Sequence, residues 1–391
     1  MSPRKRNATL FLILTLVVLG ALPIDLLLPA LPAMAAQFNL PLAHIAGVAS
    51  LYALGVAAAQ PCIGPLASRW GRKPVLVTGL ALSGVAAASV VLIDHGWALL
   101  ALRAVQGFGC GSLVLVHGLL EGRDVRSQRA LAVLVLVGAL VIAVAPLVGE
   151  ALQQQFGWQA VFLAYEFLVL FAIGLMIGVL DEEPAQAQGH SSFASYREAL
   201  RQPGLRGYSL LAALAFACHF AALVCLPVVG TLHYGLGSAQ VAQILLAYGV
   251  AALASEGIAG WLGQRLSANN QIRVGLGLTA MAAAVLALAL REASLLWCLA
   301  PLLASTLGTG LVRGAATAQA LDFAPNRPAA KALGNTLTFA CAGLLSLLTL
   351  LAEPDVRVGL LVLFVAVTLV SSLLLAAVTE TQAAERDAVN L

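Results

Sequence analysis

Charged side chains are scarce in this sequence of 391 residues: only 10% are Asp, Glu, Lys or Arg. A soluble domain usually contains about 25% charged residues, so the composition excludes an ordinary soluble protein. Apolar residues take their place, making up 61% of the chain and giving it a mean hydropathy of +0.94.

Cysteine is also rare, and none of the six cysteines lies in a loop where a disulfide framework could form. They fall inside apolar segments without a CxxC motif, which is typical of small packing residues. The sequence lacks an HExxH motif, a P-loop, a nucleophile with a matching base and an appended soluble domain, so it indicates neither an enzyme nor a sensor. We expect no metal and no cofactor. The cysteines are Cys62, Cys110, Cys218, Cys225, Cys298 and Cys341.

The apolar residues gather in twelve runs of roughly 20 residues, the length at which a helix crosses about 30 Å of hydrocarbon. This pattern predicts an all-α membrane protein with twelve transmembrane helices. The first run follows basic residues as a signal peptide does, but it is too long and contains Asp25, so we expect a retained helix. The predicted helices are 9–31, 44–67, 74–93, 98–121, 130–152, 160–180, 207–229, 241–262, 272–290, 294–316, 332–351 and 358–378.

A hydrophilic stretch at 181–206 divides these helices into two groups of six. The sequence GPLASRW at 64–70, after the second helix, resembles GWLGQRL at 260–266, after the eighth. This faint repeat predicts two pseudo-symmetric six-helix bundles. We expect an N-terminal bundle at 1–180, a cytoplasmic central loop at 181–206 and a C-terminal bundle at 207–391.

Basic residues are distributed unevenly between the predicted loops. With the N-terminus inside, 17 of the 21 Lys and Arg residues lie at the cytoplasmic face, two at the outer face and two within helices. The positive-inside rule therefore predicts that both termini are cytoplasmic. The net charge of +3 is an insertion signal and does not indicate nucleic-acid binding.

The fourth predicted helix carries one polar stripe on an otherwise apolar surface. At about 100° per residue, its polar residues fall close to one line. Such a stripe faces water or polar groups of the protein. For Arg103 we favour a cavity-lining role, with a structural ion pair as the alternative, whereas Glu121 lies at the cytoplasmic end and can simply be solvated. The stripe contains Arg103, Gln106, Gly107, Cys110, His117 and Glu121.

Asp25 lies inside the first predicted helix at a depth similar to that of Arg103. A charge at mid-membrane costs roughly 2.5–3.5 kcal/mol even on lenient scales, so the two charges indicate a pair around a cavity, a proton or a substrate. Pairing favours the charged carboxylate and loss of water favours the protonated one. A group balanced between these effects can take up and release a proton. Pro29 and Pro32 predict that the helix bends or ends nearby.

Other polar residues within predicted helices are weaker candidates. Arg313 lies close enough to a helix end to snorkel to the surface, and Glu150 is expected to be solvated at an outer helix end. Pro146 and Gly149 fit a pivot in the fifth helix, although any tightly packed bundle can have this composition. The further cavity candidates are Tyr52, His219, Tyr248 and Glu256.

Three motifs resemble those of the major facilitator superfamily, and the resemblance covers nearly the whole chain. GPLASRWGRKP at 64–74 resembles the cytoplasmic signature, LLALRAVQG at 99–107 the proton-transfer motif, and APLVG at 145–149 the antiporter motif. Asp25 with LPALP at 28–32, RD at 123–124 and GWQAVF at 157–162 are similar to the bicyclomycin- and chloramphenicol-resistance (Bcr/CflA) branch. The resemblance gives conformational roles to Gly64, Ser68, Arg69, Gly71, Arg72, Pro146 and Gly149.

Two departures from the family pattern affect these roles. Ser68 replaces an acid that, in the family, interacts with the start of helix eleven (here near 333–335) and holds the outward-facing state, so we expect a weaker latch. Glu150 replaces the final glycine of the antiporter motif, which puts the packing role of that position in question.

The resemblance implies proton-coupled export of small molecules from the cytoplasm across the bacterial inner membrane, with Asp25 and Arg103 as the coupling pair. We expect drug-like substrates. A dedicated metabolite exporter, of the siderophore or nucleoside type, is the alternative, because the ionisable candidates suit a polar substrate equally well. We expect a monomer in the lipid bilayer whose partners are its substrate and protons.

Overall fold

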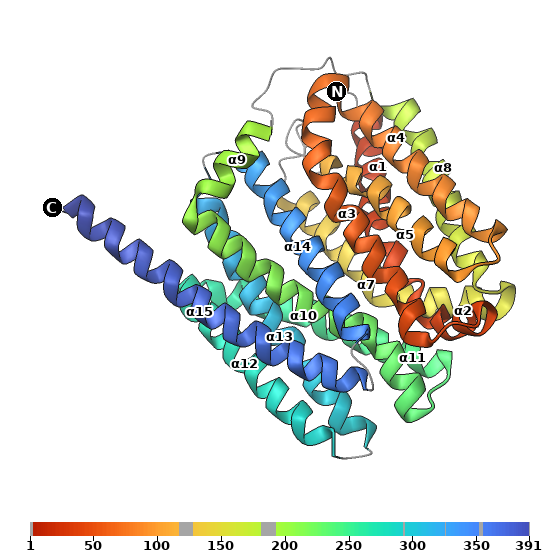
Figure 1. The fold of residues 1–391 in the computed structure, drawn as a ribbon. Helices are drawn as coiled ribbons and strands as arrows, with labels where there is room; N and C mark the ends of the chain where they lie inside the picture. Colours follow the sequence, from red (N-terminus) through yellow and green to blue (C-terminus); the bar gives the residue numbers. More distant parts are fainter. Residues whose placement is uncertain are drawn as a thin grey trace. The chain divides into compact units, whose positions relative to one another are not determined.

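The computed structural model describes residues 3–116, 128–180, 193–291, 294–324, 326–351 and 355–390. Every regular element within these ranges is helical (Figure 1). The α-helices are α1 (Pro3–Asp25), α2 (Leu31–Phe38), α3 (Leu42–Trp70), α4 (Arg72–Ser89), α5 (Gly96–Cys110), α7 (Gln128–Phe156), α8 (Gln159–Val179), α9 (Phe193–Arg201), α10 (Pro203–Tyr234), α11 (Ser238–Gly263), α12 (Ala268–Ala289), α13 (Leu295–Asp322), α14 (Arg327–Leu350) and α15 (Val356–Asn390). Three short 3-10 helices are η1 (Leu28–Ala30), η2 (Val90–Leu92) and η3 (Gly111–Leu115).

Twelve helical segments of the described chain are long and apolar enough to cross a membrane, judged by length and composition. The predicted all-α fold with twelve membrane helices is therefore confirmed. The fourth predicted helix, 98–121, is described as Gly96–Leu115, and the residues near its predicted end, including His117 and Glu121, lie outside the described ranges. Within the predicted central loop, α9 forms a short helix.

The chain forms two compact units. One contains Met1–His190 and Leu226–Gly249, and the other contains Ser191–Cys225 and Val250–Leu391. The division after residue 190 falls within the predicted central loop, whereas the segment 226–249, from α10 and α11, groups with the first unit. The prediction places this segment in the C-terminal bundle at 207–391.

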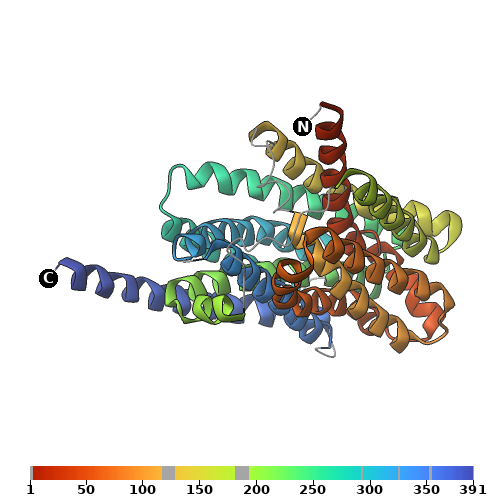
Figure 2. The same ribbon diagram turned by 90° about the horizontal axis from the view of Figure 1, so that it is seen from above.

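In the first unit, α3, α4, α5 and α8 lie side by side (Figure 1, Figure 2). The contact between α3 and α5 is close enough that a Cβ atom on Gly107 would overlap the backbone of Tyr52. Small residues permit this kind of approach between membrane helices. The close packing fixes the polar stripe of α5 against α3 and α4.

The first membrane segment is broken near its middle. α1 ends at Asp25, and the chain continues through η1 and α2. Pro29 and Pro32, at the starts of these two elements, lack the N–H that would continue the first helix. Of the bend or end predicted from these prolines, the structure shows an end, at Asp25.

The second unit contains a helical core in which α12 packs on both α13 and α15 (Figure 1). Tyr208 of α10 is fully buried there, and its ring stacks on that of Phe323 at a centroid distance of 5.9 Å. Its hydroxyl donates to Oδ1 of Asn269, near the start of α12, at 2.7 Å. Tyr208 therefore connects α10 with the start of α12 and the end of α13, and its buried hydroxyl has a hydrogen-bond partner.

Candidate functional site

Arg103 of α5 is only 1% exposed and is the centre of a buried polar group in the first unit. Its Nη2 donates to the Pro23 carbonyl at 2.8 Å, its Nη1 to Oε1 of Gln106 at 2.6 Å, and its Nε to the Val48 carbonyl at 3.3 Å. The guanidinium carbon lies 4.6 Å from the ring centre of Tyr52. The planar guanidinium can donate from three nitrogens in different directions, which suits three separate acceptors. Arg103 therefore joins α1, α3 and α5.

The acceptor on α1 is available because the helix ends there. In a continuous α-helix the Leu27 N–H would reach the Pro23 carbonyl, but here it donates to Ile24 at 3.0 Å. The Pro23 carbonyl thus lacks its helical partner, and a buried carbonyl without a partner is costly. Arg103 supplies the missing donor. The proline-rich break in the first segment therefore creates a binding place for the arginine.

Asp25 is the last residue of α1 and is 6% exposed. Among the described residues, no ion pair of 4.0 Å or less joins its carboxylate to Arg103, so the two charges that their depths made a feasible pair are not in direct contact here. The reason is that all three guanidinium nitrogens are directed at the Pro23 carbonyl, the Val48 carbonyl and Gln106. Asp25 is therefore a buried carboxylate two residues from the carbonyl that holds the arginine.

Cys110 belongs to a second buried group that joins α4, α5 and α8. Its Sγ lies 2.8 Å from the Tyr165 hydroxyl and 3.2 Å from Oγ of Ser83, and these two oxygens are 3.1 Å apart. The sequence prediction included Cys110 but missed Ser83 and Tyr165. A buried tyrosine hydroxyl usually has a partner, so the polar end of Tyr165 in an apolar helix is the signal that could have identified it.

A small cavity of about 10 Å³ lies beside the break after α1 and borders both buried groups. Arg103, Gln106 and Tyr165 line it together with apolar residues of α1 and α8. This is roughly the space that one water molecule needs. The structure thus brings Tyr52, Gln106 and Cys110 together with Arg103, and in this conformation they enclose almost no free volume.

Gly149, in the predicted antiporter motif, lies on α7 directly against the break. A Cβ atom at this position would overlap the backbone carbonyl of Leu26, the residue after Asp25. Pro146 lies one turn away within the same helix. Close approach of α7 therefore sets the position of the segment that carries Asp25.

Replacing Gly149 by alanine is expected to lower the stability of the purified protein by about 1–3 kcal/mol, the usual cost of overpacking. Gly174→Ala on α8 is the matched control, because a Cβ atom there meets nothing within 4 Å. That control should be neutral or slightly stabilising, since alanine favours a helix over glycine. Thermal unfolding in detergent measures both. Equal stability of the two variants would contradict the close contact at Leu26.

The cytoplasmic signature forms the end of α3, the turn and the start of α4. Gly71, in the turn, has φ 87° and ψ 162°, which glycine adopts without strain. The Lys73 ammonium donates to the Leu180 carbonyl at 2.8 Å, just past the end of α8, where a cation is favourable. The Ser68 hydroxyl donates to the Pro65 carbonyl at 2.7 Å. Gly64 and Arg69 lie within α3, and Arg72 begins α4.

The start of helix eleven differs from the position expected from the family pattern. α14 begins at Arg327, and the Asn326 side chain caps it by accepting from the Ala329 N–H at 3.0 Å. The expected position near 333–335 therefore lies about two turns inside the helix. The signal that could have located the start was Asn326 followed by Pro328, a usual helix-start pattern.

Three other residues singled out in the sequence are Glu150, Tyr248 and His117. Glu150 is 5% exposed and accepts hydrogen bonds from Gln154 at 2.7 Å and Ser238 at 2.7 Å, so the expected solvation is wrong. Tyr248 is 1% exposed. His117 lies outside the described residues.

The second unit contains a charged pair between α11 and α13. Nη2 of Arg313 donates to Oε1 of Glu256, and the two side chains are 41% and 47% exposed. The arginine also lies over the ring of Phe216, with its guanidinium carbon 5.7 Å from the ring centre. His219 and Phe339 have their rings 6.1 and 5.9 Å from the same phenyl ring. Arg313 is thus engaged with Glu256 while its side chain stays 41% exposed, and the snorkelling considered from the sequence stays a prediction.

Comparisons with known proteins agree with this architecture. The profile of the Major Facilitator Superfamily matches residues 13–347. The multidrug resistance protein MdtL of Escherichia coli O9:H4 (strain HS) is 32% identical over 170 residues, which are 43% of this chain and 44% of that protein. MdtL of Escherichia fergusonii is 32% identical over 189 residues, 47% of this chain and 48% of its own. The match therefore spans less than half the length of these relatives.

Two solved structures share the fold at low sequence identity. A D-xylose–proton symporter gives a TM-score of 0.74 at 13% identity and covers 94% of this chain and 97% of its own. A bacterial homologue of the human lysosomal transporter Spinster, inward-facing and unoccupied, gives 0.70 at 12% identity and covers 97% and 96%. Because the family profile extends over residues 13–347 of the 391, and the solved structures share the fold over nearly all of the chain, this multi-pass membrane protein belongs to the Major Facilitator Superfamily.

Proposed function

We propose that this protein exports small, drug-like molecules from the bacterial cytoplasm in exchange for protons, by alternating access. The observation that carries the proposal is a buried carboxylate, Asp25, at a helix break that Arg103 holds through the neighbouring carbonyl of Pro23. A carboxylate at membrane depth is a functional-site candidate by default. Because Asp25 ends α1, a change in its charge would act directly on the backbone at the helix break.

The similarity to multidrug resistance proteins supports efflux as the direction of transport. The excess of basic residues in one set of loops supports cytoplasmic termini in the inner membrane. The sequence motifs at 28–32 and 157–162 support the Bcr/CflA branch as the subtype. A weaker latch at Ser68 is consistent with its hydroxyl bonding within its own helix.

Everted membrane vesicles test this function directly. The interior is acidified by respiration, and the pH gradient is followed with a fluorescent amine. Addition of a transported compound should release protons and reduce the gradient only in vesicles that contain the protein. Ethidium, chloramphenicol and fluorescein supply a cationic, a neutral and an anionic probe. Substrate accumulation that persists when a protonophore has collapsed the gradient would overturn proton coupling.

The charged pair in the second unit supports a role in substrate selection. Glu256 and Arg313 are each close to half exposed, although both lie inside helices that can cross a membrane. With Phe216 beside them, they offer one charge of each sign and an aromatic face. Such a surface suits drug-like compounds of varied charge. It equally suits a dedicated polar metabolite of the siderophore or nucleoside type, which remains the second candidate.

Opposite changes in charge selectivity are expected when the two members of this pair are neutralised. Glu256→Gln leaves a net positive site, so ethidium transport should fall by about tenfold relative to chloramphenicol, because a lost charged contact costs about 1.5–3 kcal/mol. Arg313→Gln should depress fluorescein transport instead. Transport of the three probes in proteoliposomes measures this, with Glu198→Gln on the exposed face of α9 as control. An equal loss for all probes in both variants would assign the pair a structural role.

A further inference from the structure

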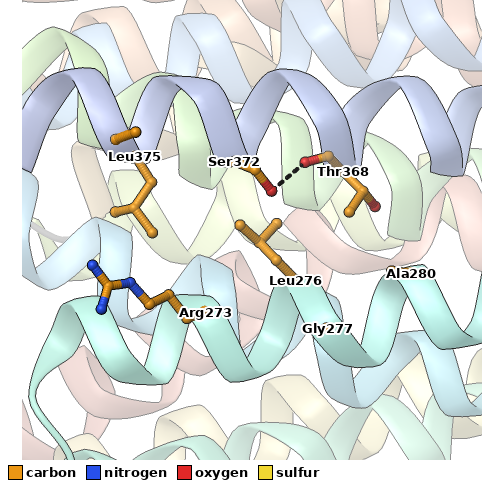
Figure 3. A pocket seen from close by; sticks show the side chains of 8 residues that line it. Arg273, Leu276, Gly277, Ala280, Thr368, Ser372 and Leu375 are labelled. Carbon is orange, nitrogen blue, oxygen red and sulfur yellow. Dashed lines mark hydrogen bonds between the residues drawn. The ribbon is translucent and has the colours of Figure 1, made fainter.

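A groove of about 350 Å³ runs between α12 and α15 on the second unit (Figure 3). Leu276 and Leu375 are largely buried and form its floor. The groove exists because Gly277, Ala280 and Ala376 are small where larger residues would close it. A Cβ atom added to Gly277 would meet nothing within 4 Å. No side chain therefore fills the groove at Gly277.

The body of this groove is apolar in spite of its two hydroxyl groups. Thr368 donates to the Phe364 carbonyl at 2.7 Å, and Ser372 donates to the Thr368 carbonyl at 2.8 Å (Figure 3). Both hydroxyl protons are thus used within α15, and neither is left for a ligand. A polar molecule would find few hydrogen-bond partners along this surface, whereas a hydrocarbon chain needs none.

One end of the groove is cationic. Arg273 lies five residues after the start of α12, about 7.5 Å along the helix axis. Its side chain is exposed and extends toward α15 beside Leu375 (Figure 3). Among the described residues, no carboxylate forms an ion pair of 4.0 Å or less with it. Glu380 lies a turn beyond Ala376 on α15 and makes no such pair.

Both helices that border the groove expose large apolar side chains, as helices in contact with lipid do. Val274 and Met281 of α12 are 44% and 55% exposed, and Leu369 and Leu373 of α15 are 61% and 73% exposed. Large apolar side chains exposed along a membrane helix contact acyl chains. The Arg265 guanidinium lies 4.0 Å from the ring centre of Trp261, just before α12, an arrangement typical of the membrane–water interface.

We propose that this groove binds an anionic phospholipid; the assignment to the cytoplasmic leaflet rests on the membrane orientation proposed above. Arg273 pairs with the headgroup phosphate, and one acyl chain lies between α12 and α15 from Leu375 toward Ala280. Basic pockets between transmembrane helices at the cytoplasmic face are suited to such headgroups. The occupant is amphipathic because the charge and the apolar surface lie at opposite ends of one groove. A soluble anion would use only Arg273 and leave the rest of the groove unfilled.

Native mass spectrometry of the detergent-purified full chain tests the proposal, with dioleoyl phosphatidylglycerol as the anionic lipid and the corresponding phosphatidylethanolamine as the zwitterionic one. Wild type should retain phosphatidylglycerol preferentially. Arg273→Gln should weaken that binding by about fivefold, the value of one basic side chain at an anionic surface. Gly277→Leu should remove the same adduct by filling the groove while Arg273 is kept. Arg265→Gln, an arginine outside the groove, is the matched control.

Three outcomes would overturn this assignment. Phosphatidylglycerol binding that is unchanged in both Arg273→Gln and Gly277→Leu would place the lipid elsewhere. Displacement of the lipid by inorganic phosphate at equal concentration would identify a site for a free anion. Loss of a dimer in Gly277→Leu, measured by light scattering, would identify a second copy of the chain as the occupant. Thermal unfolding of both variants is the control that checks whether they remain folded.

Discussion

Replacing Asp25 by asparagine is expected to reduce proton-driven transport to the level of vesicles without the protein, while the protein remains folded and inserted. Asparagine has nearly the same shape as aspartate but cannot take up and release a proton. Asp25 is almost completely buried and forms no ion pair in the described structure, so its replacement leaves no cation unpaired. The measurements are substrate-induced proton release in everted vesicles and substrate exchange without a gradient.

These two measurements separate coupling from binding. Asp25→Asn should lose proton release but keep exchange of substrate between the two sides, because exchange requires only the conformational change. The matched control is Asp94→Asn, which alters an exposed carboxylate in the loop before α5 and should behave as wild type. Normal proton release from Asp25→Asn would remove this residue from the coupling mechanism.

Arg103→Lys is expected to reduce both proton-driven transport and exchange by more than about tenfold. Lysine keeps the charge, but its single ammonium cannot reach the three divergent acceptors of the guanidinium. Each hydrogen bond from a charged donor contributes about 1.5–3 kcal/mol, and a loss of about 1.4 kcal/mol is tenfold in an equilibrium. The Pro23 carbonyl would then lack a donor, and the end of α1 would lose its attachment to α5.

Arg103 therefore acts as a positioning residue, and its replacement should affect different transport activities from the replacement of Asp25. Both activities fall in Arg103→Lys, whereas only coupling falls in Asp25→Asn. Arg291→Lys, at an exposed position two residues after the end of α12, is the control for the substitution itself. If Arg103→Lys kept exchange at the wild-type rate, the hydrogen bond to Pro23 would have no part in the conformational cycle.

The twelve candidate membrane spans and the local helix geometry were determined by the sequence itself. A run of about 20 apolar residues can satisfy its backbone in lipid only as a helix, so the twelve spans follow from length and hydropathy. The break in the first segment follows from Pro29 and Pro32, because proline cannot donate within a helix. The turn at Gly71 follows from a conformation that other residues rarely adopt.

The partners of the polar side chains were decided only by the tertiary structure. Helical periodicity placed Arg103 and Cys110 on one face of a helix, but it contains no information about which remote group lies opposite. Arg103 bonds to a carbonyl freed by a break 80 residues earlier, and Cys110 bonds to Tyr165, 55 residues later. Such contacts depend on the packing distance between helices, and that distance is set by small residues whose effect appears only when the neighbouring helix is known.

Whether a charged side chain is buried was also decided only by the tertiary structure. Glu150, at a predicted helix end, was expected in water, yet Gln154 and Ser238 donate to it in the interior of the first unit. Sequence gives the cost of burying each charge, whereas only the fold supplies the donors and acceptors that offset that cost.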